Sequence, residues 1–234
     1  RMAQEFSLRY PLVKGQGNFG CFTADTKVQL ADGRNLNFLE LIQEWKEKKK
    51  NYTFTVSKEG NAKIAEIKHP RKTKENQELI KITLDNEESI KCTLNHKFLL
   101  KNLTYKEAKD LKEGDSLMPL YQKVSTEQDS KYSIGYSMLY QPKENIWSFI
   151  HHLADEYNLE QGLYSIKAGR VRHHKDFNKC NNNPNNIQRM QWSEHRKLHN
   201  NIASEKHKDQ EYVKKIAEGR KIFWSNPENR IKYS

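Results

Sequence analysis

The sequence predicts a multi-domain chain in which a mainly β domain is followed by an α-rich one, and three observations carry this prediction. Between residues 21 and 120, short β-branched or aromatic runs alternate with polar turns. After residue 120 the composition becomes polar and includes Gly135 and Pro142. The formal net charge of +11 is concentrated late in the chain: residues 165–234 carry 16 Lys and Arg against 7 Asp and Glu, whereas residues 21–120 carry 19 against 16.

The elements of the β part follow from period-two alternation. Strands are expected at five runs: KVQL (27–30), YTFTVS (52–57), ELIKITL (78–84), SIKC (89–92) and KFLL (97–100). The one clear helix there is NFLELIQEWKEKK (37–49), because its apolar residues share one face. Residues 121–144 are expected to form a linker.

The α-rich part begins with a predicted helix, NIWSFIHHLADEYNL (145–159). Near the end, KDQEYVKKI (208–216) recurs as SNPENRIKY (225–233), a repeat of 17 residues with Asp209 and Asn226 at matching N-cap positions.

Composition excludes several classes of protein. The three cysteines Cys21, Cys92 and Cys180 form no CxxC pair, so neither a disulfide framework nor a cysteine zinc ribbon is expected, and a reducing, cytoplasmic setting fits. No apolar run is long enough to span a membrane, so no membrane partner is expected. The basic C-terminal third favours a polyanion, and nucleic acid in particular, over the alternative of a solvated lysine-rich helical tail.

A glycine-rich polar loop runs directly into Cys21 in the stretch GQGNFGCFTADTKVQLADGR (15–34). A cysteine after Gly20 can attack the uncrowded glycine carbonyl and convert the peptide bond into a thioester. This reaction needs a group that protonates the departing amine, and Thr93 and His96, in SIKCTLNHKFLL, have the TxxH spacing that places a hydroxyl and an imidazole on one side of a turn. The alternative is a buried cysteine with a satisfied core histidine.

Three blocks in order, CFTADTKVQLADGR, IKCTLNHKFLL and LKEGDSLMPL, resemble the N-terminal blocks of inteins, the self-splicing members of the Hint family. The resemblance covers residues 21–120 and implies a mainly β, horseshoe-shaped splicing domain. It also implies that Cys21 performs the N-to-S acyl shift, and that Thr93 and His96 polarise and break the scissile bond.

The first 20 residues resemble the segment that precedes the catalytic tyrosine in the A subunit of bacterial DNA gyrase, so they are expected to be host-protein flank. The only His-Asn pair, His199-Asn200, is followed by Asn201, which offers no nucleophile. We therefore expect the C-terminal splice segment to be absent from this chain. The alternative to a complete homing intein is then the N-terminal piece of a split intein, whose partner is a separate C-terminal fragment.

The stretch VRHHKDFNKCNNNPNNIQRMQWSEHRKLH (171–199) predicts a strand, an Asn-rich loop, a second strand and a helix capped by Ser193. His195 and His199 are four apart on that helix and can share one cation. Alternation on the first strand points His173 and His174 in opposite directions.

This unit resembles the HNH nucleases in their His-rich ββα-metal form, over residues 145–200. The resemblance implies an α+β endonuclease in which His174 is the general base and Asn186 holds that histidine and the loop. It assigns His173, His195 and His199 to a divalent metal ion, with Mg or Mn the working ion and Zn or Ni able to occupy the site. His199 is equally well explained as a surface histidine, and His151 and His152 as packing or phosphate contacts.

Residues 201–234 resemble, weakly, the helical DNA-reading repeats of intron and intein nucleases. The expected partner is double-stranded DNA at the uninterrupted gyrase gene junction. The residues expected to meet phosphates are Arg170, Arg172, Lys175, Lys214, Lys215, Arg220, Lys221, Arg230 and Lys232.

Overall fold

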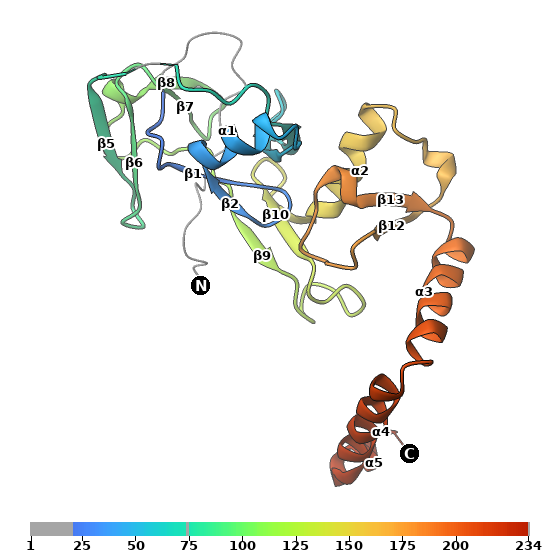
Figure 1. The fold of residues 1–234 in the computed structure, drawn as a ribbon. Coiled ribbons are helices and arrows are strands. Elements are labelled where there is room, and N and C mark those ends of the chain that lie inside the picture. Colours follow the sequence, from blue (N-terminus) through green and yellow to red (C-terminus); the bar gives the residue numbers. More distant parts are fainter. Residues whose placement is uncertain (1–20, 74, 234) are drawn as a thin grey trace. The chain divides into compact units, whose positions relative to one another are not determined.

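The structure, a computed structural model, describes residues 21–73 and 75–233 (Figure 1). The chain divides into two compact units, one formed by residues up to 166 together with 172–188, the other by 167–171 together with the residues from 189 onward. Within the described residues, no helix is both long and apolar enough to cross a membrane.

The strands are short and pair antiparallel. Their bounds are β1 Lys27–Gln29, β2 Asn35–Asn37, β3 Tyr52–Val56, β4 Ala62–Glu66, β5 Leu79–Thr83, β6 Ser89–Thr93, β7 Lys97–Leu99, β8 Tyr105–Glu107, β9 Gln122–Val124, β10 Ser137–Gln141, β11 Ile146–Phe149, β12 Val171–His174 and β13 Ile187–Met190. The helices are α1 Phe38–Lys46, α2 Ile150–Glu160, α3 Trp192–Lys206, α4 Gln210–Ser225 and α5 Pro227–Tyr233, with 3-10 turns η1 Ala108–Asp110, η2 Ile166–Ala168 and η3 Pro184–Asn186. All five strands and the helix predicted between residues 21 and 120 are confirmed.

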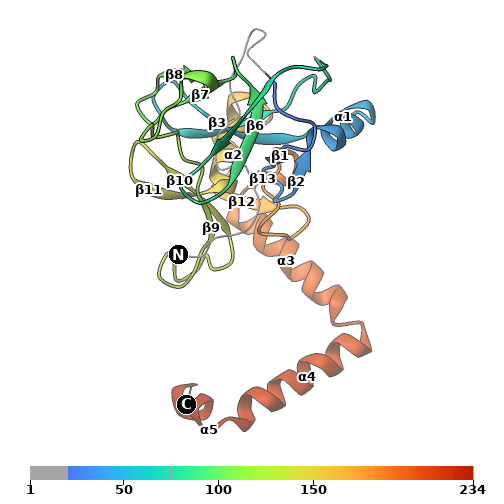
Figure 2. The same ribbon diagram turned by 90° about the vertical axis from the view of Figure 1, so that its left-hand side faces the viewer.

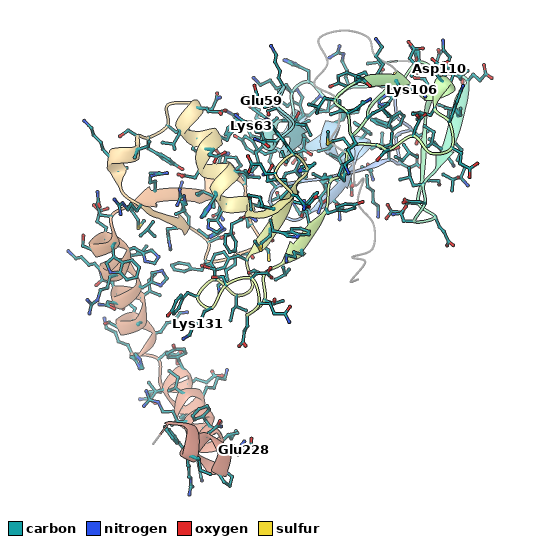
Figure 3. All side chains as sticks on the ribbon, turned by 180° about the vertical axis from the view of Figure 1, so that it is seen from behind. Glu59, Lys63, Lys106, Asp110, Lys131 and Glu228 are labelled. Carbon is teal, nitrogen blue, oxygen red and sulfur yellow. The ribbon has the colours of Figure 1, made fainter. Side chains whose placement is uncertain are left out.

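The main core of the first unit forms around the β3–β4 hairpin. Phe54 pairs with Ile64, and alternation buries both side chains on one face. Helix α2 covers that face with Ile150, Leu153 and Ala154, and lies beside β3 and β10 in Figure 2. An ion pair of 2.6 Å between Lys63 of β4, labelled in Figure 3, and Glu160 closes the end of α2.

The predicted linker at residues 121–144 is wrong. This segment forms β9 and β10, which with β11 make a three-stranded sheet. Leu139 of β10 is fully buried in the same core as β3, β4 and α2. The polar composition of the segment comes largely from the exposed turn between β9 and β10. Met138 and Leu139 of β10 are both buried.

A second core lies under the β5–β6 hairpin, which pairs Ile80 with Cys92 and Ile82 with Ile90. Phe98 of β7 and Ala108 of η1 complete it. Burial raises the pKa of the Cys92 thiol to about 11, so this cysteine is an inert core residue.

Helix α1 is fixed at its start by Asn37, whose side chain accepts from the Glu40 N–H at 3.0 Å while Glu40 accepts from the Asn37 N–H at 2.7 Å. Its buried residue Leu41 packs with Val28 and Leu30 of the β1–β2 hairpin. The sequence pattern identified this helix from its apolar face, and the structure adds the cap at Asn37.

The second unit contains α3, α4 and α5. Among the described residues, no side chain of α3 or α4 is fully buried. The predicted N-caps are confirmed: the Asp209 carboxylate accepts from the Glu211 N–H at 2.9 Å, and the Asn226 side chain accepts from the Glu228 N–H at 2.9 Å. Helix α3 differs from its prediction, because its N-cap is Gln191, whose N–H donates to Glu194, and Ser193 lies inside the first turn.

The helix predicted at 145–159 begins later than expected. The residues Ile146–Phe149 form β11 along β10, and the helix starts only at Ile150. Pairing to an existing strand satisfies the backbone of these residues, which outweighs their helical pattern.

Candidate functional site

The candidate splice junction lies at the start of the described chain, where Cys21 is tied to Thr93 by two hydrogen bonds. The Cys21 N–H donates to Thr93 Oγ1 at 2.7 Å, and the Thr93 N–H donates to the Cys21 carbonyl at 2.9 Å. The Cys21 sulfur also lies 3.0 Å from Thr73 Oγ1, in the loop between β4 and β5. Gly20, the other half of the predicted scissile bond, lies outside the described residues.

His96 is placed close to this junction by the turn that follows β6. The backbone N–H of His96 donates to the Thr93 carbonyl at 3.0 Å, and the centroid of its ring lies 4.0 Å from that of the Phe22 ring. Burial lowers the pKa of His96 to about 4, so the ring is neutral at neutral pH. Within the described part of the chain its buried Nδ1 has no hydrogen-bond partner, and the Cys21 N–H is held by Thr93 instead.

A pocket of about 730 Å³ opens beside the Cys21 thiol. Thr73 and Thr93 line it together with apolar residues of α1 such as Phe38. The loop between β4 and β5 adds His69, Pro70, Arg71, Lys72, Asn76 and Gln77. The thiol therefore faces a concave, partly basic surface large enough for a peptide segment.

The predicted nuclease residues His173 and His174 lie on β12, and both side chains are buried with 5% of their surface exposed. His174 Nε2 lies 3.1 Å from Asn182 Oδ1, and its ring is close to those of Tyr136 and His151. The predicted contact between Asn186 and His174 is replaced by one from Asn182.

Asn186 holds the loop. Its amide donates to Asp176 Oδ1 and to the Asn181 carbonyl, both at 2.8 Å, and its own Oδ1 accepts from the Asp176 N–H. The sequence pattern therefore identified the loop-fastening role correctly. The sequence analysis missed Asn182. The run CNNNPNN contains five asparagines, and nothing in the sequence shows which of them contacts His174.

His195 and His199 are brought together on α3 as the i, i+4 spacing predicts. Their Nε2 atoms are 3.1 Å apart and their ring centroids 4.4 Å apart. Partial burial, followed by the charge of His199, lowers the pKa of His195, which favours an unprotonated nitrogen. Two imidazoles facing each other match the donor set of a divalent cation that accepts nitrogen ligands.

The predicted phosphate-binding residues fall into two groups. Arg170, Lys214, Arg220 and Lys221 are exposed, as are Lys175, Lys215 and Arg230. Arg172 differs, because its Nε donates to the Asp155 carboxylate at 2.9 Å and Asp155 is fully buried. Neutralising that buried carboxylate is its structural role. The side chain of Lys232 is not among those that the structure describes.

His151 is buried with 8% of its surface exposed, so it packs, which is one of the two roles, packing or phosphate contact, that the sequence left open. Its ring lies between those of Phe149, His152, Tyr136 and His174.

A mainly β unit in which Cys21 is bonded to the threonine of a TxxH turn defines a candidate self-processing protein. The chain matches the intein splicing domain family over residues 28–226. It therefore belongs to the intein splicing domain family, as the resemblance of its N-terminal blocks implied.

Relatives connect the chain to DNA gyrases. It is similar to the B subunit of DNA gyrase from Synechocystis sp., with 44% identity over 224 residues that cover 95% of this chain and 20% of the relative. It is also similar to the A subunits of DNA gyrase from Mycobacterium kansasii and Mycolicibacterium flavescens, each 43% identical over 54 residues, 18% of this chain and 10% of the relative. The chain thus spans a fifth or less of these relatives. The predicted link to gyrase is confirmed, and the choice between its two kinds of subunit stays a prediction.

Proposed function

We propose that this chain performs the N-to-S acyl shift at the Gly20–Cys21 bond as the first step of protein splicing. The Cys21 thiolate attacks the Gly20 carbonyl carbon, a C–S bond forms, and the C–N bond breaks as the Cys21 nitrogen takes up a proton. The observation that carries this proposal is the 2.7 Å hydrogen bond from that nitrogen to Thr93 Oγ1. His96, neutral and buried, is the group that takes up and passes on the proton.

The test is incubation with a strong thiol, which intercepts the thioester and releases a peptide that ends at Gly20. Mass spectrometry identifies the released peptide. Cys21→Ala removes the nucleophile and should abolish release, whereas Cys92→Ala, which alters only a core thiol, should leave it. Release from Cys21→Ala at the wild-type rate would contradict the proposal.

The second proposed activity is that of an HNH homing endonuclease that cuts double-stranded DNA at the uninterrupted gyrase junction in the cytoplasm. His174 takes a proton from the attacking water, and that water forms the new P–O bond as the bond to the leaving oxygen breaks. His174 is buried on β12 with a fixed hydrogen-bond partner, which suits a general base.

A divalent cation would be held by His195 and His199, whose ring nitrogens already face each other on α3, with His173 as the further ligand. Each of these three side chains offers a ring nitrogen as a ligand atom. Such a cation would stabilise the charge that develops on the phosphate oxygens, and Mg or Mn is the expected working ion, with Zn or Ni able to occupy the site.

The nuclease test uses duplex DNA that spans the uninterrupted junction, with Mg or Mn. His174→Ala should abolish cutting and leave retention on DNA intact, while retention should fall steeply as salt rises because phosphate contacts release counterions. Equal loss of cutting and of retention in His174→Ala would contradict the base assignment.

A split-intein function is the second candidate, and the pocket beside Cys21 favours it because a separate C-terminal intein fragment would have to dock within reach of that thiol. Mixing the chain with such a fragment should yield ligated flanks only if the fragment binds. Substituting Phe38, which lines the pocket, by Asp should weaken this ligation and spare thiol-induced release at Cys21.

A further inference from the structure

Asn182, in the loop between β12 and β13, is fully buried, and its backbone N–H and both ends of its side-chain amide have partners. Its N–H donates to the Ala31 carbonyl at 2.9 Å, and its Nδ2 donates to the Cys180 carbonyl at 3.1 Å. The remaining oxygen, Oδ1, lies 3.1 Å from His174 Nε2. A buried amide with this set of contacts is held in one orientation.

This arrangement determines which nitrogen of His174 carries the proton. The Cys180 carbonyl can only accept, so the amide group facing it is the NH₂ and the group facing His174 is the oxygen. That oxygen can only accept as well. The Nε2 of a neutral His174 is therefore protonated, and its Nδ1 carries the lone pair.

The anchor of Asn182 belongs to the splicing part of the first unit. Ala31 follows β1, is buried, and donates its own N–H to the Tyr52 carbonyl of β3 at 2.8 Å. A second tie fastens the same loop, since Lys179 Nζ donates to the Ile134 carbonyl at 3.0 Å. The imidazole is thus oriented by a residue that is itself fixed to the β strands.

We propose that Asn182 is a positioning residue for the nuclease, which holds His174 in the Nε2–H tautomer so that Nδ1 receives the proton of the attacking water. This inference rests on the proposed nuclease function. It also assigns part of the nuclease geometry to the splicing scaffold, because Asn182 is anchored on Ala31.

The tautomer can be measured without DNA. The full chain is labelled with ¹⁵N-histidine, and ring nitrogens are observed in long-range ¹H–¹⁵N spectra at about pH 8, where an ordinary imidazole is neutral. The His174 signals are identified by their loss in His174→Gln. The wild type should show a protonated Nε2 and an unprotonated Nδ1, and Asn182→Leu should lose this pattern. A protonated Nδ1 in the wild type would overturn the inference.

The cleavage assay gives the second readout, on duplex DNA with Mg or Mn. Asn182→Leu should cut at least about tenfold more slowly, up to the roughly 10²–10⁴-fold that a general base contributes. Asn182→Asp keeps an acceptor oxygen on Nε2 and should retain both the Nε2–H pattern and most of the cutting, which also decides the case if the leucine variant does not fold. Asn178→Ala, which removes only a side-chain bond to the Cys180 N–H, is the matched control.

The outcomes separate the two proposals. If the wild type shows the Nε2–H pattern but leaves the DNA intact with either metal, the nuclease function is overturned, while the assignment of the His174 tautomer is supported. If the wild type cuts DNA and a folded Asn182→Leu cuts equally well or keeps the same ring pattern, the positioning role of Asn182 is overturned.

Discussion

At the scale of single residues, the Cys21 thiol is held by a group that the sequence did not indicate. Its backbone is fixed to Thr93 on both sides, while its sulfur lies 3.0 Å from Thr73 Oγ1. The hydroxyl therefore sets the direction in which the sulfur points. Because an acyl shift needs the sulfur aimed at one carbonyl carbon, this contact should affect the rate.

Thr73→Val keeps the shape of the side chain and removes the hydroxyl. A hydrogen bond contributes about 0.5–1.5 kcal/mol net, so its loss should lower the rate of thiol-induced release about 2- to 10-fold. Thr104→Val, whose hydroxyl bonds only to the exposed Asn102 side chain, is the control and should leave the rate unchanged. Equal rates for Thr73→Val and the wild type would show that the contact has no role in the reaction.

The TxxH spacing predicted the pairing of Cys21 with Thr93 because both belong to strand-end segments with a readable pattern. Thr73 and Asn182 could not be predicted in the same way. Each sits in a loop without periodicity, and each acts through a contact with a residue far away in the chain or across a tight turn. Local pattern carries no information on such contacts.

At the scale of elements, one ionic network fixes α1 to the β1–β2 turn. The Arg34 guanidinium bonds Glu44 of α1 at 2.6 Å and Asp32 of the turn at 2.8 Å, and it also donates to Asn51. Burial alone would raise the pKa of Glu44, but hydrogen bonds from Arg34, Lys49 and Asn51 outweigh it and lower that pKa to about 2.

Glu44→Gln should therefore lower the free energy of unfolding by about 2 kcal/mol at neutral pH, after allowance for the partial exposure of Arg34. Because the folded pKa of Glu44 is depressed, its contribution is present above pH 4.5 and is lost as pH falls towards 2. Urea unfolding measures this, with the exposed Glu87→Gln as control. A difference between variant and wild type that persists undiminished near pH 2 would contradict the assignment.

The two histidines of α3 that face each other lead to a separate prediction about metal binding. Removing one imidazole of the His195–His199 pair should weaken the binding of Zn or Ni by at least about 10–100-fold, the loss that removal of a group supporting a ligand already causes, measured by calorimetry on the full chain. His207→Ala, at the C-cap of the same helix with its ring against Tyr212, is the matched control. Unchanged affinity in both His195→Ala and His199→Ala would remove the pair from the metal site.

Elements were predicted well where the local pattern is strong, as for α1, whose apolar residues share one face. They were missed where tertiary contacts decide. The segment with β9 and β10 was expected to be a linker, yet its Leu139 is fully buried among residues of β3, β4 and α2. A short strand that packs into a core built mainly by other elements needs only a few apolar residues, so the sequence pattern does not reveal it.

At the scale of the whole molecule, Cys21, Thr93 and His96 belong to the same folded unit as His173, His174 and the loop that carries Asn182. The core under α2 also contains Ile187, at the start of β13, and the loop before it is anchored on Ala31. Two histidines, one near each proposed site, are buried without charge: burial lowers the pKa of His96 to about 4, and burial with the charges of neighbouring histidines lowers that of His151 to about 3.

These two histidines should make the unit acid-sensitive in a defined window. A histidine with a depressed folded pKa stabilises the fold above its unfolded pKa of about 6.5, and the contribution is lost as pH falls from there. Protonation linked to each of these histidines should lower the free energy of unfolding by about 2–3 kcal/mol between pH 6.5 and 4. This loss begins at a higher pH than the loss caused by Glu44. His151→Phe should flatten the dependence of the unfolding free energy on pH in this window. If wild type and His151→Phe lose stability equally between pH 6.5 and 4, protonation of His151 is not what acid acts on.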